Sequence, residues 1–197
     1  MKKQIKVTLI VIVAAIIAAA IIWYVMYLRG KEQDLLTPVG TRAEFIGDTD
    51  KYPTMLTAKG TQILNADGEQ VVLKGVMVPE SRSLYEEKKF NEDFYKDVFA
   101  KGGNAIRVPI SPMEYKNDDY YMWRYLDRIV TWAGENDNYV ILDWDYTGNP
   151  IDGSGDEMPD LDENPLDYSA EFWKNIADYF KNTPNVILRN NKRENKK

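Results

Sequence analysis

Strand-like apolar runs alternate with helix-like segments over most of this chain. Three runs, residues 70–78, 104–110 and 138–144, each come before a helix-like segment. A fourth run, 185–188, is followed by only nine residues, so no helix is expected after it. Strands that alternate with helices predict an α/β fold with a parallel sheet whose faces are covered by the helices. Nearly continuous apolar composition is typical of strands that are buried on both sides.

The three helix-like segments are amphipathic. In residues 90–101, apolar side chains recur at helical spacing and the segment ends at Gly102. Residues 120–132 and 172–180 have the same spacing of apolar side chains. Each segment therefore predicts a helix that packs one face on the sheet.

A β-hairpin is predicted near the start of the folded part. Two β-prone runs, Thr61–Leu64 and Gln70–Leu73, flank an Asp67-Gly68 turn, and Asp-Gly between such runs is a strong hairpin signal. Residues 29–55 have no sustained period and contain several glycines and prolines, which is typical of a linker. The folded domain is therefore expected to cover residues 56–197.

No charged residue lies between Val7 and Leu28. About 20 apolar residues span a bilayer as a helix, so residues 7–28 are predicted to form a transmembrane anchor. Lysines in residues 1–6 favour a cytoplasmic N-terminus, a single pass through the cell membrane and an extracellular C-terminal domain. The alternative is a signal peptide cleaved at residues 18–20, but the apolar run continues past that site and favours the anchor.

Beyond the predicted anchor the chain is acidic. Five of the 25 basic residues and none of the 31 acidic ones precede residue 32, which leaves 20 basic against 31 acidic residues after it. Such a charge balance disfavours nucleic acid as a partner. The absence of cysteine and histidine excludes disulfides, zinc sites built from these residues, Ser-His-Asp triads and Cys-His pairs. No cofactor is predicted.

An acidic stretch at residues 151–168 holds seven acidic and no basic side chains. Asp152, Asp156, Asp160 and Asp162 suggest calcium, but their spacing lacks the regular ligand pattern of a calcium loop. Charge runs of this kind are more typical of a solvated loop. We therefore predict a loop here and no metal site.

Polar and aromatic side chains lie where two of the predicted strands end, and parallel α/β folds carry their chemistry at these carboxyl ends. Arg107 lies near the end of one strand, and Asp143, Trp144, Asp145 and Tyr146 lie at the end of the next. Aromatic rings stack on sugar faces, carboxylates accept hydrogen bonds from hydroxyl groups, and an arginine keeps a neighbouring carboxylate ionised. The last four side chains are therefore candidates for binding a carbohydrate substrate. Alternatively, Arg107 and Asp143 form a structural ion pair.

Five segments between residues 56 and 188 follow one another in a distinctive order. They are the hairpin 61–73 with Lys74-Gly75-Val76, Gly103–Pro109, Tyr139–Trp144, Glu171–Ala177 and Pro184–Ile187. Together they resemble the N-terminal half of glycoside hydrolase family 5, the cellulase family. The resemblance implies a (β/α)8 TIM barrel, of which this chain holds about the first four strands, with a hairpin that closes its bottom. It also implies retaining hydrolysis of O-glycosyl bonds in β-glucan or β-mannan polysaccharides.

Only part of the family's catalytic set carries over to this sequence. Arg107 matches the family arginine that orients the nucleophile, and Asp145 stands where the family has a histidine. The family acid/base glutamate follows the fourth strand in an Asn-Glu-Pro motif, where this chain reads Arg189 to Glu194. The nucleophile belongs to a seventh strand. The chain is therefore expected to be truncated and inactive.

A hypothesis about the gene concerns the tail. If Arg189 is encoded AGA, skipping the first base of its codon recovers the spacing Glu-x-x-Asn-Glu but not the family's proline. Glu194 is a catalytic candidate only if the tail is misread in this way. The alternative is a basic, solvated tail, which needs no special event.

Three functional classes stay open on the sequence. The first is a membrane-anchored β-glycan hydrolase, here a fragment. The second is a non-catalytic glycan-binding remnant, and the third is a membrane-tethered interaction module without a role in carbohydrate binding. Capture on glycan separates the third class from the others, and release of reducing sugar separates the first from the second.

Overall fold

The computed structural model describes residues 12–27, 49–146 and 164–190, and the chain divides into two compact units, residues 1–37 and 38–197. In the first unit, residues 12–27 form a helix whose side chains are exposed. Within the described part of the chain, no helix has both the length and the apolar character that a membrane crossing requires. The predicted anchor extends beyond this helix at both ends, outside the described residues.

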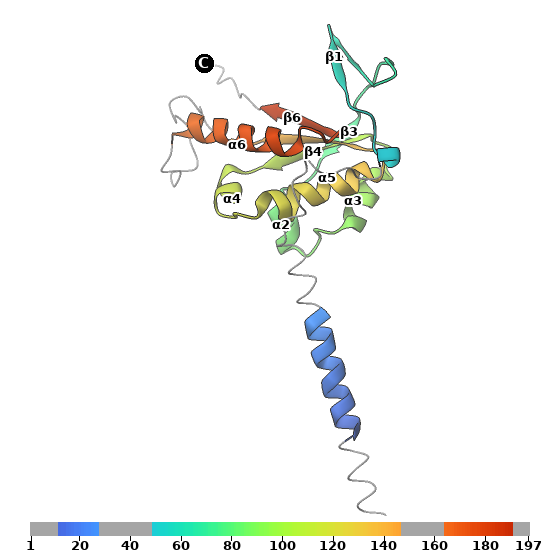
Figure 1. Cartoon of the computed structure of the whole chain (residues 1–197), viewed down its shortest axis with the longest axis vertical. Helices are drawn as coiled ribbons and strands as arrows, with labels where there is room; N and C mark the ends of the chain where they lie inside the picture. The colour runs from blue at the N-terminus through green and yellow to red at the C-terminus, as the bar shows by residue number, and fades with distance from the viewer. Residues whose placement is uncertain (1–11, 28–48, 147–163, 191–197) are drawn as a thin grey trace, which may run out of the picture. The chain divides into compact units, whose positions relative to one another are not determined.

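The second unit is built on a four-stranded sheet (Figure 1). Its strands are β3 (Gly75–Met77), β4 (Ala105–Ile110), β5 (Tyr139–Trp144) and β6 (Val186–Asn190). They pair in the order β3-β4-β5-β6, and every pair is parallel. The predicted α/β fold with a parallel sheet is thereby confirmed.

The first strand of this sheet is shorter than the predicted run 70–78. Gln70 bridges Leu64, and the N–H of Lys74 donates to the Oδ1 atom of Asn104 at 2.7 Å. The side-chain amide of Asn104 also donates to the carbonyl of Val72 at 3.1 Å. Because these groups bond to the hairpin and to Asn104, pairing in the sheet begins only at residue 75.

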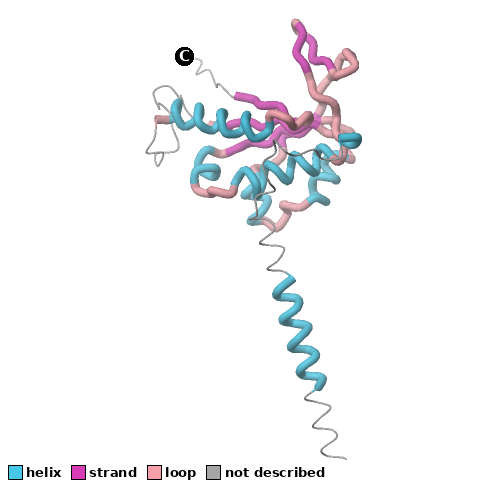
Figure 2. The backbone as a smooth tube through the Cα atoms, viewed as in Figure 1, coloured by secondary structure: helices cyan, strands magenta, loops and turns pink. Residues whose placement is uncertain are grey.

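The hairpin differs from the predicted one in its partners. Strand β1 (Thr57–Lys59) pairs with β2 (Gln62–Leu64), while the predicted second run is joined to β2 mainly by the bridge at Gln70. The predicted turn is present, since the Oδ1 atom of Asn65 accepts from the N–H groups of Asp67 and Glu69. Two successive turns thus replace one long hairpin, and its tip stands away from the sheet (Figure 2).

Short and long helices connect the strands. In chain order they are η2 (Thr49–Lys51), α2 (Ser81–Glu86), α3 (Glu92–Phe99), α4 (Pro112–Lys116), the π-helical turn η3 (Met122–Leu126), α5 (Asp127–Gly134) and α6 (Pro165–Phe180). The pattern of apolar residues predicted α3, η3 with α5, and the second half of α6. It missed α2 and α4, which are too short to have a full apolar period.

Helix α6 begins two turns before the predicted residue 172. The side chain of Asn164 accepts from the N–H of Leu166 at 2.9 Å, and Pro165 occupies the first turn. Asparagine caps and a proline in the first turn are both favourable at a helix start. The end of the predicted acidic loop is therefore helical, and its residues 151–163 lie outside the described part.

The core lies between the helices and one face of the sheet. Trp144 of β5 stacks on Phe172 of α6, with ring centroids 3.9 Å apart. Helix α3 contributes Tyr95, which is fully buried although it was not among the apolar residues predicted for that face. Tyr121 and Tyr125, in the predicted amphipathic segment 120–132, are buried in the same core.

Candidate active site

Arg107, in the middle of β4, forms an ion pair with Asp143, near the carboxyl end of β5. The Nε atom of Arg107 donates to Oδ2 of Asp143 at 2.7 Å, and its Nη2 atom donates to the same oxygen. The Asp143 side chain is 0% exposed, whereas that of Arg107 is 27% exposed. The alternative predicted for these two residues, an ion pair, is thus what the structure contains.

Strand register explains why these two side chains meet. Arg107 lies opposite Ile141, and Asp143 is two residues further along the same strand. Side chains two residues apart in a strand point to the same face. Both therefore lie on the sheet face opposite to Trp144, which packs against α6.

A second arginine reaches Asp143 from the other side. Arg189 of β6 is the register partner of Asp143, and its Nε atom lies 3.7 Å from Oδ1. The sequence analysis treated Arg189 only as the start of the tail. The signal was available in the sequence. If Ile187 is aligned with Ile141 of β5, the residue two positions further along β6 is Arg189, opposite Asp143.

Trp144 and Tyr146 do not present rings for stacking on a substrate. They are 2% and 4% exposed, and the indole N–H of Trp144 donates to the Oγ atom of Ser169 at 2.9 Å. Neither ring therefore offers an open face in this structure, and their role in substrate binding stays a prediction. The physical reason is alternation, which turns Trp144 towards the helices when Asp143 faces the other side.

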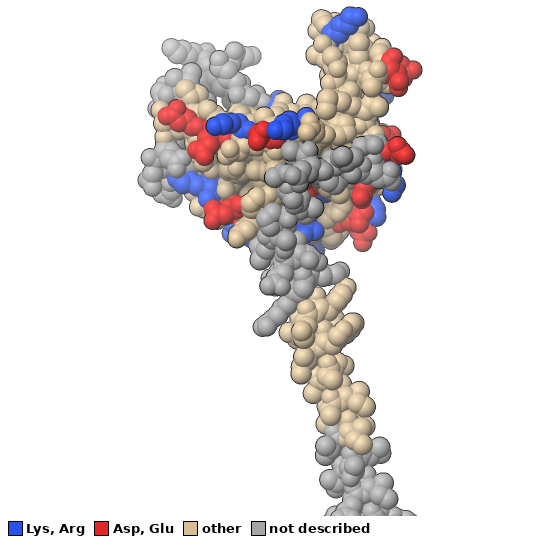
Figure 3. Space-filling model, viewed as in Figure 1, with Lys and Arg blue, Asp and Glu red and all other residues tan. Residues whose placement is uncertain are grey.

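The other predicted site residues have different positions. Asp145 is half-buried, and its N–H donates to the carbonyl of Ile110 at 3.0 Å, which extends the pairing of β4 and β5 by one step. Glu194 lies outside the described residues. On the face drawn in Figure 3, basic and acidic side chains are interspersed, without a broad patch of one sign.

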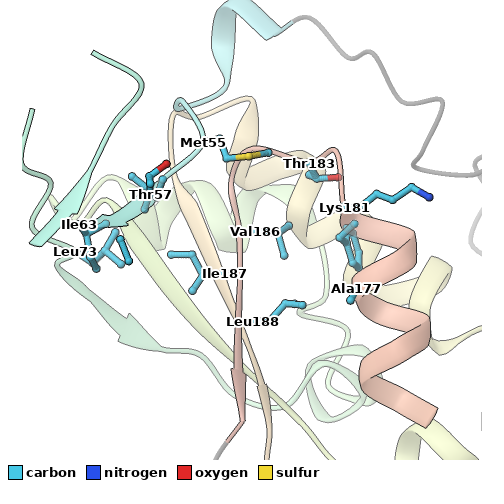
Figure 4. Close-up of a pocket in the computed structure, with 13 residues that line it drawn as sticks. Met55, Thr57, Ile63, Leu73, Ala177, Lys181, Thr183, Val186, Ile187 and Leu188 are labelled. Carbon is cyan, nitrogen blue, oxygen red and sulfur yellow. The ribbon is translucent and has the colours of Figure 1, made fainter. Parts of the chain in front are cut away.

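An apolar groove of about 400 Å³ lies beside β6. It is lined mainly by apolar side chains of the hairpin segment, α6 and β6. Figure 4 shows Val186 and Leu188 on the side of β6 that faces α6, and Ile187 on the opposite side. None of the described residues that line the groove is an aspartate or a glutamate. Alternation along β6 places Arg189 on the same face of the sheet as Ile187.

Comparison with known proteins identifies the family. The family model for Cellulase (glycosyl hydrolase family 5) matches residues 64–190. The chain belongs to glycoside hydrolase family 5. The resemblance noted in the sequence is thereby confirmed. All four parallel strands of this family 5 chain, β3 to β6, lie within the matched residues.

Two curated relatives are endoglucanases. Endoglucanase A of Butyrivibrio fibrisolvens is 28% identical over 153 residues, which are 70% of this chain and 31% of the relative. Endoglucanase C of Evansella cellulosilytica is 25% identical over 186 residues, which are 81% of this chain and 22% of the relative. The chain thus spans less than a third of the length of either relative.

Solved structures share the fold. A β-glucanase from Saccharophagus degradans in complex with cellotetraose superposes with a TM-score of 0.62 at 23% identity, over 71% of this chain and 42% of that chain. The catalytic domain of a Thermobifida fusca endoglucanase superposes with a TM-score of 0.52 at 20% identity, over 76% and 44%. At this level of identity the likeness concerns the fold alone.

Proposed function

We propose that this family 5 protein acts on β-linked glucan. The observation that carries the proposal is the family match over residues 64–190, within which Arg107 of β4 and Asp143 of β5 are paired on one face of the sheet. Arg107 then corresponds to the family arginine that orients the nucleophile. The curated endoglucanases support a glucan substrate, and β-mannan is the second substrate to test.

We propose further that this chain by itself binds glycan without hydrolysing it. Retaining hydrolysis needs two carboxyl groups about 5–5.5 Å apart, one protonated and one ionised. Asp143 is 0% exposed and its carboxylate is bound by Arg107, so it is not open to a glycosidic oxygen. Asp145 directly follows the strand of Asp143, so these two carboxyl groups do not face each other from opposing strands. This supports a role in glycan binding.

For residues 7–28 we propose a membrane anchor that places the C-terminal domain outside the cell. The support is the absence of charge in this segment and the lysines before it. Fractionation of cells that express the tagged full chain tests this, with protease added to intact cells. Recovery of the chain in the soluble fraction, or protection of the C-terminal tag from protease, would contradict the anchor or its orientation.

The proposed glycan role is tested with the full chain in mild detergent. Retention on insoluble cellulose and on mannan measures binding, and release of reducing sugar measures hydrolysis. We expect retention on cellulose and no reducing sugar above the blank. A chain that binds neither polysaccharide would favour the interaction module, and turnover that disappears in Arg107→Ala would overturn the proposed inactivity.

A further inference from the structure

Two arginines share one buried carboxylate at the carboxyl end of the sheet. Arg107 and Arg189 approach Asp143 from β4 and β6, and Asp143 supplies a single negative charge. One carboxylate neutralises one guanidinium, so this trio carries a surplus positive charge. Arg189 is the less well paired of the two, because 3.7 Å is too long for a hydrogen bond.

The guanidinium groups keep donors available for a ligand. Each arginine has five N–H donors. Arg107 uses its Nε and Nη2 atoms on Oδ2 of Asp143, and Oδ1 of Asp143 has no hydrogen bond. Among the described residues, neither guanidinium has another hydrogen-bond or ion-pair partner. Their side chains are 27% and 48% exposed, so the unused donors are within reach of solvent and of a ligand.

The two arginines also lie at a suitable separation. Neighbouring strands are about 4.8 Å apart, which puts β4 and β6 roughly 10 Å from each other, with β5 between them. Both side chains lean towards Asp143 and thus converge over β5. A planar carboxylate that lies over this point can accept from both guanidinium groups, and such charge-assisted bonds are among the strongest in proteins. Asp145 directly follows β5, and alternation places its carboxylate on the same face, where it would oppose an anion.

We propose that Arg107 and Arg189 bind the carboxylate of a uronic acid, so that the glycan recognised by this chain is a β-linked polysaccharide with acidic sugar residues. This inference rests on the proposed glycan function and adds the charge of the substrate to it. The surplus positive charge of the trio and its unused N–H donors favour an anionic ligand over a neutral one.

The test compares two tetrasaccharides that differ only at C6, which is a hydroxymethyl group in one and a carboxylate in the other. Cellotetraose and its C6-oxidised counterpart, a β-1,4-linked tetraglucuronate, are titrated calorimetrically into the full chain in mild detergent. We expect the oxidised sugar to bind roughly tenfold more tightly or better, as for hydrogen bonds between charged groups. Arg189→Met abolishes this preference, Arg189→Lys keeps part of it, and Asp145→Asn increases it. Arg82→Met is the matched control, because it removes an arginine of similar exposure on α2 and leaves the preference unchanged.

Each result decides between the two proposals. Equal affinity for both sugars, or a preference that survives Arg189→Met, overturns the acidic-glycan assignment and leaves the neutral-glycan function in place. Binding of the oxidised sugar alone supports the assignment and rejects the neutral substrate. If neither sugar binds, both proposals fail. If acetate or phosphate at the concentration of the sugar displaces it, the arginines form a general anion site and the assignment to a glycan is wrong.

Discussion

The hydroxyl group of Tyr121 donates a 2.6 Å hydrogen bond to the Oε1 atom of Glu80. The other carboxylate oxygen of Glu80 accepts from the N–H groups of Arg82 and Ser83, which begin helix α2. A single carboxylate therefore caps α2 and joins it to the segment before η3, across 41 residues of sequence. This contact fixes the connection that follows β3 against the connection that follows β4.

Replacing Tyr121 by phenylalanine is expected to destabilise the domain by about 1.5–3 kcal/mol. The substitution removes a hydrogen bond to a charged group and leaves one Glu80 oxygen without its buried donor. Urea denaturation of the full chain in detergent measures the change. Tyr85→Phe removes the hydroxyl of another tyrosine near Tyr125 and is the control, with an expected change below about 0.5 kcal/mol. Equal losses in both variants would contradict the role of the Glu80 contact.

Alkaline pH is expected to unfold the domain. Burial raises the pKa of Tyr121 well above its ordinary value of 10.0, and the negative charge of Glu80 raises it further. Burial and Glu80 likewise raise the pKa of Tyr95. In the folded state these hydroxyl groups keep protons that the unfolded state releases, so stability is complete below about pH 10 and falls as the pH rises above it.

Circular dichroism and tyrosinate absorbance, followed together from pH 8 to pH 12, check this expectation. Both signals should change in one cooperative step for the buried tyrosines. Tyr95→Phe should move the midpoint of unfolding to higher pH, because one buried ionisable group is gone. Gradual ionisation with unchanged circular dichroism would contradict it.

Trp144→Ala should destabilise the domain by about 3–5 kcal/mol, the usual cost of removing a large aromatic side chain from a core. The ring is 2% exposed and stacks on Phe172. Thermal unfolding measures the loss, and Trp23→Ala, at an exposed tryptophan in the other unit, is the control. If Trp144→Ala lowered glycan affinity with stability intact, the ring would be a substrate platform and the burial argument would be wrong.

Gly75→Ala should disrupt the edge of the sheet. A Cβ atom at this position would collide with the carbonyl oxygen of Ala105 on β4. Because the obstacle is backbone, the two strands must separate, and the expected cost is roughly 3 kcal/mol or more, at the upper end of the cost of overpacking. Gly60→Ala, in an open turn with φ of 61°, is the comparison and should cost about 1–2 kcal/mol from backbone strain alone. Hydrogen exchange of the β3 amides distinguishes the two variants: exchange should become faster in Gly75→Ala and stay unchanged in Gly60→Ala.

The strands and most helices follow from local patterns. β4, β5 and β6 begin within one residue of the predicted apolar runs, because strands buried on both faces require continuous apolar sequence. The prediction of strand bounds was wrong where the backbone groups of a segment form hydrogen bonds to residues outside the predicted strand. Residues 70–74 look like a strand, but their backbone groups are taken by β2 and Asn104, which no local pattern records.

The neighbours of the candidate site residues depended on tertiary structure more than the strands and helices did. The sequence by itself determined the α/β class, the family and the placement of Arg107 and Asp143 in neighbouring buried strands, since period and composition are local properties. Only the tertiary structure decided that Arg189 lies beside Asp143 and that Trp144 is buried against α6. Strand order and register set these neighbours, because they bring together residues that are far apart in the chain and assign each side chain to one face of the sheet.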